Sequence, residues 1–250
     1  MKWYQSALLG AVQGLTEFLP VSSTAHLNLV RQKLHWPSPG MVLDTTLHLG
    51  TLLATLAWMW QEEQSEPLLD LPLVAKVCVA TLPAGLAGLF LEKWIERHLR
   101  SPHITSAMLI AGGGLLWFSE QQAKAQSDLK QMSYQQAFGI GLAQMLALIP
   151  GLSRSGITMT AGLISGLKRP DAVRFSFLMS IPIVAASGLF KLKDIKDHEQ
   201  MTELLKALLS GGFTAAVFGF VSLEWFLSYV KASSLKPFAA YRILLGLKEI

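Results

Sequence analysis

Long apolar stretches separated by short polar ones dominate this sequence. Six of them have the length and apolarity of membrane-spanning helices, and they lie near 41–60, 72–91, 104–120, 172–190, 206–229 and 236–248, the last being short. A helix needs roughly 20 apolar residues to cross the hydrocarbon core of a bilayer. The charged residues collect between these stretches, for instance in 61–67 and 92–102. The pattern predicts an all-α integral membrane protein with about six transmembrane helices.

Two further apolar segments do not fit a single span. Residues 6–34 are interrupted by Pro-Val-Ser-Ser-Thr at 20–24, and residues 134–167 by Pro-Gly-Leu-Ser-Arg-Ser-Gly at 150–156. Proline lacks a backbone donor and hydroxyl side chains compete for backbone hydrogen bonds, so each segment is predicted to form a helix, a polar elbow and a second short helix. Such elbows are tolerated within a bilayer only where protein or water surrounds them. We therefore expect two re-entrant helical hairpins that face each other.

The two interrupted segments resemble each other. A shift of 131 residues, the difference between 141 and 10, superimposes Gly10 on Gly141, Gln13 on Gln144 and Ser22 on Ser153. Three predicted spans separate the segments, so the second one enters from the opposite face. We expect one membrane domain, 1–250, built as an inverted repeat (repeat 1 about 5–120, repeat 2 about 134–250) with its site near the midplane. Two ordinary kinked helices are the alternative.

Composition and charge agree with a membrane protein. Hydrophobic residues make up 51% of the chain and charged residues 15%, whereas about 25% is usual in soluble domains. The net charge is +4, and the basic residues lie in loops and at span ends, so we expect no nucleic-acid partner. The single cysteine, Cys78, rules out a disulfide framework and is expected to be buried.

Three ionisable residues of the interrupted segments are candidates for chemistry. Glu17 lies deep in an apolar run, where a charge costs roughly 2.5 to 3.5 kcal/mol on insertion scales, and this indicates a function. His26 follows the first elbow, and a histidine near a hydroxyl group is the minimal pair that activates a nucleophile, whereas a hydrogen-bonded core histidine is the structural alternative. Arg154 lies in the second elbow, and its planar guanidinium suits phosphate or carboxylate. An internal ion pair with Glu17 is the structural alternative.

Five hydroxyl side chains surround these residues, namely Ser22, Ser23, Thr24, Ser153 and Ser155. The combination suits phosphoryl transfer, which depends mainly on positioning and on neutralising negative charge. Glu17 could also hold a divalent ion such as Mg²⁺, which prefers oxygen ligands.

Four other polar residues receive structural interpretations. Asp44 and His48 begin the first full span and are expected to be helix-end or interfacial residues. Glu224 and Arg242 lie deeper, and we expect them to pair between the last two spans.

Two motifs resemble the undecaprenyl-diphosphate phosphatases of the bacitracin-resistance type. Residues 13–26, QGLTEFLPVSSTAH, are similar to that family's Glu/Gln-x-x-x-Glu motif with its serines and histidine, and residues 150–158, PGLSRSGIT, fit its Pro-Gly-x-Ser-Arg-Ser-x-x-Thr motif. Weaker similarities at 47–51, 175–178 and 237–242 extend the likeness over nearly the whole chain. Gln13 stands where many members have Glu, which removes one metal ligand, and Ala25 stands where Gly is common.

The resemblance implies hydrolysis of undecaprenyl diphosphate to the monophosphate and phosphate, which recycles the lipid carrier of peptidoglycan synthesis and gives bacitracin resistance. It implies a multi-pass protein of the bacterial cytoplasmic (inner) membrane, a polyprenyl diphosphate lipid as substrate, and a divalent cation, Mg²⁺ or Ca²⁺, as cofactor. The resemblance does not decide whether the protein forms a homodimer. The implied catalytic positions are Glu17, also the metal ligand, Ser23, His26 and Arg154. The substrate-binding positions are Gln13, Ser22, Ser153, Ser155 and Thr158, to which we add Thr24 of the first elbow.

Two alternatives remain. Ser23 activated by His26 would give a phosphoserine intermediate, whereas His26 activating water would give none, and we prefer Ser23. The rival function is an inverted-repeat transporter or flippase of an anionic lipid, because broken helices around a charged midplane site are a transporter layout. Such a protein would bind the diphosphate without releasing phosphate.

Overall fold

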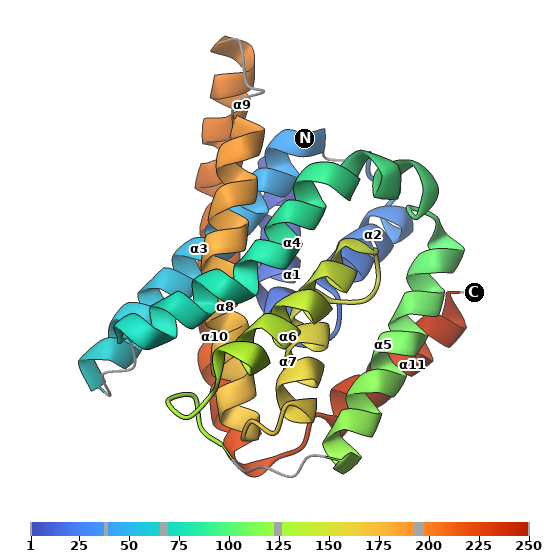
Figure 1. The fold of residues 1–250 in the computed structure, drawn as a ribbon. Coiled ribbons are helices and arrows are strands. Elements are labelled where there is room, and N and C mark those ends of the chain that lie inside the picture. Colours follow the sequence, from blue (N-terminus) through green and yellow to red (C-terminus); the bar gives the residue numbers. More distant parts are fainter. Residues whose placement is uncertain (1, 38–39, 66–69, 123–126, 193–197, 250) are drawn as a thin grey trace.

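The structure is a computed structural model that describes residues 2–37, 40–65, 70–122, 127–192 and 198–249 (Figure 1). Its helices are α1 (Trp3–Glu17), α2 (Ser23–Lys33), α3 (Gly40–Ser65), α4 (Leu71–His98), α5 (Pro102–Gln122), α6 (Tyr134–Met145), η1 (Leu146–Leu148), α7 (Arg154–Ile164), α8 (Arg169–Leu192), α9 (His198–Ala207), η2 (Leu208–Gly212), α10 (Phe213–Ala232) and α11 (Lys236–Lys248). Of these, η1 is a 3₁₀ turn and η2 is π-helical. The described residues contain no strand, so the predicted all-α class is confirmed.

Four helical stretches among the described residues are long and apolar enough to cross a membrane. They are Val42–Gln64, Leu71–Leu91, Arg169–Lys191 and Met201–Ala232. Each coincides with a predicted span, which agrees with a membrane protein. The other two predicted spans form α5 and α11, which are helices as predicted but are not among these four.

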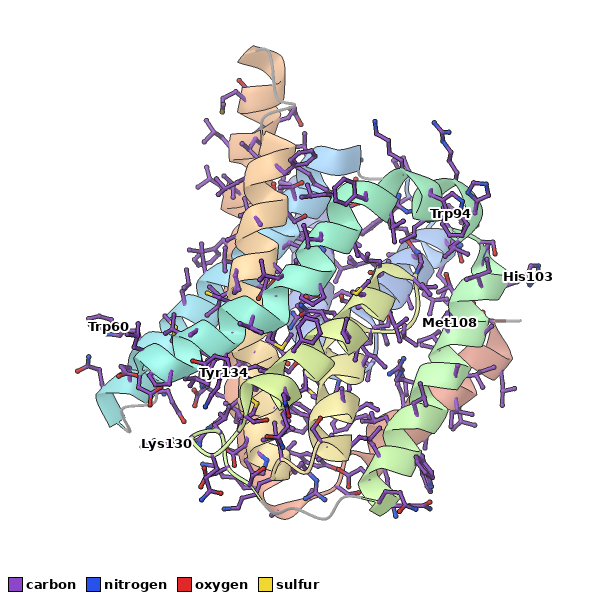
Figure 2. The ribbon with its side chains drawn as sticks, viewed as in Figure 1. Trp60, Trp94, His103, Met108, Lys130 and Tyr134 are labelled. Atoms are coloured by element: carbon purple, nitrogen blue, oxygen red, sulfur yellow. The ribbon has the colours of Figure 1, made fainter. Side chains whose placement is uncertain are left out.

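Large apolar side chains cover the outside of the helices. Trp60 is 71% exposed and Leu209 is 81% exposed, and Figure 2 shows Trp60 projecting from the outer face of α3. Cys78 on α4 is exposed as well, so its predicted burial was wrong. The reason is that lipid is as apolar as a protein core, so hydrophobicity does not decide which face of a membrane helix is buried.

Two helix pairs have matching partners in the two halves of the chain. The first helix, α1, packs along α10, and α6 packs along α4. Glycine permits a close approach in both places: a Cβ on Gly10 would lie 2.1 Å from the carbonyl oxygen of Gly211 in η2, which leads into α10, and one on Gly141 would lie 2.3 Å from that of Ala80. Gly10 and Gly141 are the pair that the shift of 131 residues aligns.

Each interrupted segment folds as a helix, an elbow and a second helix, as predicted. The first elbow contains Pro20, which cannot donate a backbone hydrogen bond, and α2 begins after Ser22. Ser22 has φ 72° and Ser153, before α7, has φ 67°, a left-handed conformation that few residues other than glycine adopt. Gly151 has φ 96°, and a Cβ there would lie 2.3 Å from the carbonyl oxygen of Thr105, so this turn requires glycine.

The second elbow is held between two long helices, because α7 packs against α5 and against α8 (Figure 1). Beside the first elbow, Phe18 packs edge-on against Phe177 of α8 with ring centroids 5.3 Å apart. Phe177 also contacts Trp58 of α3, and all three rings are fully buried. This aromatic core fixes the end of α1, where Glu17 lies.

Candidate active site

The two elbows enclose a small cavity of about 180 Å³. Its polar lining includes most of the predicted site residues, namely Glu17, Ser22, Ser23, Thr24, Ser153, Arg154 and Ser155. Residues more than a hundred positions apart in the sequence are therefore brought to one place.

The carboxylate of Glu17 connects the groups around this cavity. Nη2 of Arg154 donates to Oε1 of Glu17 at 2.9 Å. Oγ of Ser23 donates to Oε2 at 2.7 Å, and Nε2 of Gln13 donates to the same oxygen at 2.9 Å. A buried ion pair persists where further hydrogen bonds satisfy both charges, and Glu17 has them. The ion pair expected as the structural alternative is thus present, and it joins the two elbows.

The start of α7 adds positive potential to the site. Oγ of Ser153 accepts a hydrogen bond from the backbone amide of Gly156 at 3.1 Å and so caps the helix. Oγ of Ser155 donates to the carbonyl oxygen of Leu19 at 3.0 Å, which is a second link between the elbows. Because Arg154 is the first residue of the helix, its charge and the positive end of the helix dipole lie together.

Thr158 supports Arg154 and does not line the cavity. Its Oγ1 donates to the carbonyl oxygen of Arg154 at 2.8 Å and shares a 2.7 Å hydrogen bond with Oγ of Ser176 on α8. Nη1 of Arg154 donates to the carbonyl oxygen of Ser176 at 3.1 Å. These bonds fix the guanidinium in the orientation that reaches Glu17.

His26 faces away from the small cavity. Its Nδ1 lies 2.8 Å from the carbonyl oxygen of Ser22, which can only accept, so Nδ1 carries the hydrogen. Nε2 then accepts from the hydroxyl of Tyr241 at 2.7 Å. The structure therefore does not place His26 against Ser23. The carboxylate that Ser23 contacts is that of Glu17.

His48 is a site residue that the sequence interpretation missed. It lines the small cavity, and its Nδ1 lies 3.1 Å from Nε2 of Gln13. The helix-end part of its interpretation was wrong, because α3 begins at Gly40, two turns before His48. The signal that could have found it is the weak family similarity at 47–51.

The predicted pair of Glu224 and Arg242 is also wrong. Glu224 accepts a hydrogen bond from Nε2 of Gln61 at 3.4 Å. Arg242 donates instead to the carbonyl oxygens of Gly151 and Leu152 in the second elbow. The two residues lie on α10 and α11, which are adjacent in the sequence but face different neighbours.

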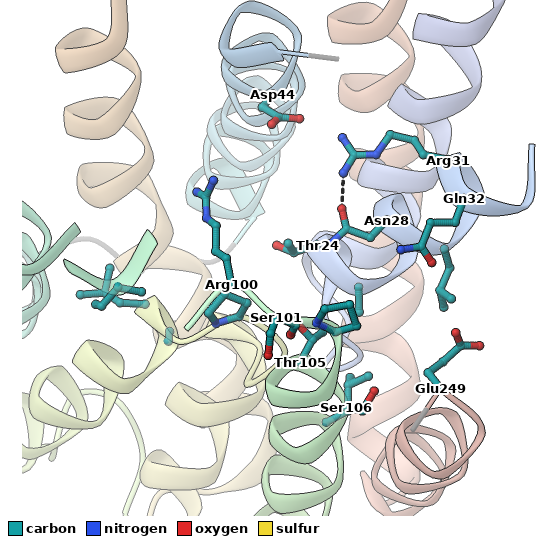
Figure 3. A pocket seen from close by; sticks show the side chains of 18 residues that line it. Thr24, Asn28, Arg31, Gln32, Asp44, Arg100, Ser101, Thr105, Ser106 and Glu249 are labelled. Atoms are coloured by element: carbon teal, nitrogen blue, oxygen red, sulfur yellow. Dashed lines mark hydrogen bonds between the residues drawn. The ribbon is translucent and has the colours of Figure 1, made fainter. Parts of the chain in front are cut away.

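A larger cavity of about 750 Å³ adjoins the small one and shares Thr24, Ala147 and Pro150 with it. Figure 3 shows its polar side chains, with Arg31 hydrogen-bonded to Asn28. Asp44 lines this larger cavity. Polar groups therefore extend from the small cavity into a vestibule.

Glu17 and Gln13 carry oxygen atoms of the kind that a divalent cation binds. Oε1 of Gln13 is buried, and it has no hydrogen-bond partner within the described part of the chain. No group of three or more His, Cys, Asp or Glu side chains that could hold a metal occurs among those residues. A hard cation such as Mg²⁺ keeps several waters and needs only one or two carboxylates plus substrate phosphates, and the carboxylate of Glu17 and the amide oxygen of Gln13 are oxygen donors of that kind.

Comparisons with known proteins all point to one family. Residues 6–248 match the sequence model described as bacitracin resistance protein BacA. The undecaprenyl-diphosphatase of Moorella thermoacetica is 41% identical over 97% of this chain and 94% of its own length. Those of Alcanivorax borkumensis and Alteromonas mediterranea are 40% and 39% identical, each over 98% of this chain and 97% of theirs. These matches confirm the resemblance seen in the two motifs, and the chain belongs to the bacitracin resistance protein BacA family.

Proposed function

We propose that this protein hydrolyses undecaprenyl diphosphate to undecaprenyl phosphate and inorganic phosphate. Relatives named for this activity align with nearly the whole chain. The observation that carries the proposal is the cluster of Arg154, Glu17 and Ser23, hydrogen-bonded in one cavity at the start of α7. An arginine at a helix N-terminus attracts a phosphate, and a hydroxyl beside a carboxylate supplies a nucleophile.

Arg154 is the group that would bind the diphosphate. Its ion pair with Glu17 holds the guanidinium at the cavity, and a phosphate that enters competes with Glu17 for its donors. The hydroxyls of Ser153 and Ser155 line the same cavity. Donors that are held in place before the reaction stabilise developing charge strongly, so this arrangement serves the transition state.

Ser23 is the proposed nucleophile. Its hydrogen passes to Oε2 of Glu17 while Oγ attacks the terminal phosphorus, and the bond from that phosphorus to the bridging oxygen breaks. Glu17 then gives this proton to the bridging oxygen as undecaprenyl phosphate leaves, and Ser23 carries the phosphoryl group. Water next attacks the phosphorus with Glu17, again a carboxylate, as base, and Glu17 returns the proton to Oγ of Ser23 as the bond from Oγ to phosphorus breaks, which releases inorganic phosphate. His26 contributes through Ser22, whose carbonyl oxygen it binds at the start of α2.

We also propose a divalent cation, Mg²⁺ or Ca²⁺, held by Glu17 and Gln13. When bound, it would neutralise charge on the diphosphate.

For the membrane arrangement, we propose a multi-pass protein of the bacterial cytoplasmic (inner) membrane with six spans, α5 and α11 included, and two re-entrant hairpins. We also propose the inverted repeat, 5–120 and 134–250. Three observations support it: the matched packing of α1 with α10 and of α6 with α4, the equivalent glycines Gly10 and Gly141, and the left-handed Ser22 and Ser153 before α2 and α7.

The experiment that tests the function is phosphate release from a long-chain polyprenyl diphosphate by detergent-purified protein, with and without EDTA. Wild type should release phosphate in a metal-dependent manner, and Arg154→Ala should lose this activity. Gln135→Ala, at the exposed start of α6, is the control that should behave as wild type. Folded wild type that binds the diphosphate but releases no phosphate would contradict hydrolysis and favour a transporter or flippase of an anionic lipid.

A further inference from the structure

Arg242 is fully buried in α11 and reaches across to the second elbow. Its Nη2 donates to the carbonyl oxygens of Gly151 at 3.2 Å and Leu152 at 2.6 Å. Its Nε and Nη1 have no hydrogen-bond partner among the described residues. A buried cation is costly unless hydrogen bonds compensate its charge, and the bonds of Arg242 end on the two residues before Ser153.

Two other helices leave room for this guanidinium. A Cβ on Gly112 of α5 would lie 2.1 Å from Nη2 of Arg242, and a Cβ on Gly156 of α7 would lie 2.5 Å from Nη1. Since neither position tolerates a side chain while Arg242 stays in place, α5, α7 and α11 are fitted to one another around its charge.

The elbow that Arg242 binds has a conformation that the chain does not favour by itself. Ser153 has φ 67°, in the left-handed region, and Gly151 has φ 96°. Charge-assisted hydrogen bonds are stronger than neutral ones, so a guanidinium on two successive carbonyl oxygens is suited to hold such a turn. Immediately after this turn, Ser153 caps α7 and Arg154 enters the cavity.

We propose that Arg242 is a positioning residue of the phosphatase reaction: it holds residues 151–153 in the turn that directs Ser153 and Arg154 into the cavity. Arg242 itself does not line that cavity. The inference rests on the proposed function, because its readout is turnover. It assigns a role in the active site to α11, which begins at Lys236, 82 residues after Arg154 in the sequence (236 minus 154).

The first test compares Arg242→Met with Arg242→Lys in purified protein. Displacing catalytic groups by about 1 Å costs roughly 10²-fold in rate, so Arg242→Met should lower kcat by about that factor, with a smaller change in KM. Arg242→Lys keeps a cationic donor and should recover a substantial part of kcat. Melting temperatures measured alongside separate turnover from folding. A folded Arg242→Met enzyme with wild-type kcat would overturn the proposal.

The second test leaves Arg242 in place and changes its surroundings. Gly112→Ala should displace the guanidinium and lower kcat, whereas Gly114→Ala on the same helix should not, because no atom lies within 4 Å of the added Cβ. In an Arg242→Met background, Gly112→Ala should cost little more. Equal kcat for Gly112→Ala and Gly114→Ala would overturn the proposal. If wild type and Gly114→Ala both released no phosphate, the proposed function would fail instead.

Discussion

Ser23 donates its hydroxyl hydrogen to Oε2 of Glu17 across 2.7 Å, and both residues are buried. The ring of His26 lies on the same short helix but is turned toward Ser22 and Tyr241. A nucleophile needs a base within hydrogen-bond reach, and Glu17 meets that condition. Hydrogen bonds therefore connect these three residues in the order Arg154, Glu17, Ser23.

Ser23→Ala should lower kcat by at least about 10³-fold, because it removes the proposed nucleophile. Wild type, rapidly quenched with substrate labelled in the terminal phosphate, should carry label on Ser23, and Ser23→Ala should not. Ser22→Ala is the matched control: it removes a neighbouring hydroxyl of the same cavity, and the label should stay. An active Ser23→Ala enzyme would show that water is the nucleophile.

The ion pair of Glu17 and Arg154 should govern stability as well as turnover. Removing one partner of a buried pair leaves an uncompensated charge, which costs about 3–5 kcal/mol. Glu17→Gln should therefore lower the melting temperature in detergent and abolish turnover. The double variant Glu17→Gln with Arg154→Met should melt above Glu17→Gln alone, because no isolated charge remains. Simple addition of the two single losses would argue against a coupled pair.

The chemistry of the two elbows could be predicted from local sequence. Glu17 and Arg154 each stand out as a charged residue in an apolar run beside prolines and hydroxyl side chains. These local patterns therefore identify the site residues without knowledge of the fold. The helices around each elbow follow for the same reason, since proline and serine interrupt helices locally. The structure places both residues on one cavity.

Side-chain partners from distant helices could not be predicted in this way. The ring of His26 is turned away from Ser23 because its Nε2 is hydrogen-bonded to the hydroxyl of Tyr241, which lies 215 residues later in the sequence. Arg242 binds backbone carbonyls, which every residue carries and no sequence pattern marks. The outward position of Cys78 depends on lipid contact, which leaves apolar helix faces without a distinguishing pattern.

Gln13→Glu should strengthen metal binding. The substitution places a second carboxylate beside Glu17, where Nε2 of Gln13 now lies 2.9 Å from Oε2. Two adjacent carboxylates repel each other without a cation and bind one more tightly, so half-maximal activity should need about tenfold less Mg²⁺ or Ca²⁺. Titration of the metal after EDTA treatment measures this. The metal-free variant should also melt below wild type, and added metal should restore it.

Gln135→Glu, at the exposed start of α6, is the control for this experiment. It adds the same charge away from the cavity and should leave the metal requirement unchanged. Identical metal titrations for Gln13→Glu and wild type would rule out the proposed metal site at Gln13 and Glu17.

The close contact of α6 with α4 provides a test of the packing that carries the second elbow. Gly141→Ala adds a Cβ 2.3 Å from the carbonyl oxygen of Ala80, so the helices must separate, and overpacking of this kind costs about 1–3 kcal/mol. Gly139→Ala on the same helix meets no atom within 4 Å and should be neutral or slightly stabilising, since alanine favours helix over glycine. Thermal unfolding in detergent compares the two.

Gly141→Ala should also lower kcat, because α6 leads through η1 into the elbow that ends at Arg154. Gly10→Ala provides the equivalent test at the other hairpin, where a Cβ would lie 2.1 Å from the carbonyl oxygen of Gly211. If the two halves of the chain are built alike, both variants should lose stability while Gly139→Ala does not. Loss at Gly10 with none at Gly141 would contradict equivalent packing of the two hairpins and, with it, the inverted repeat.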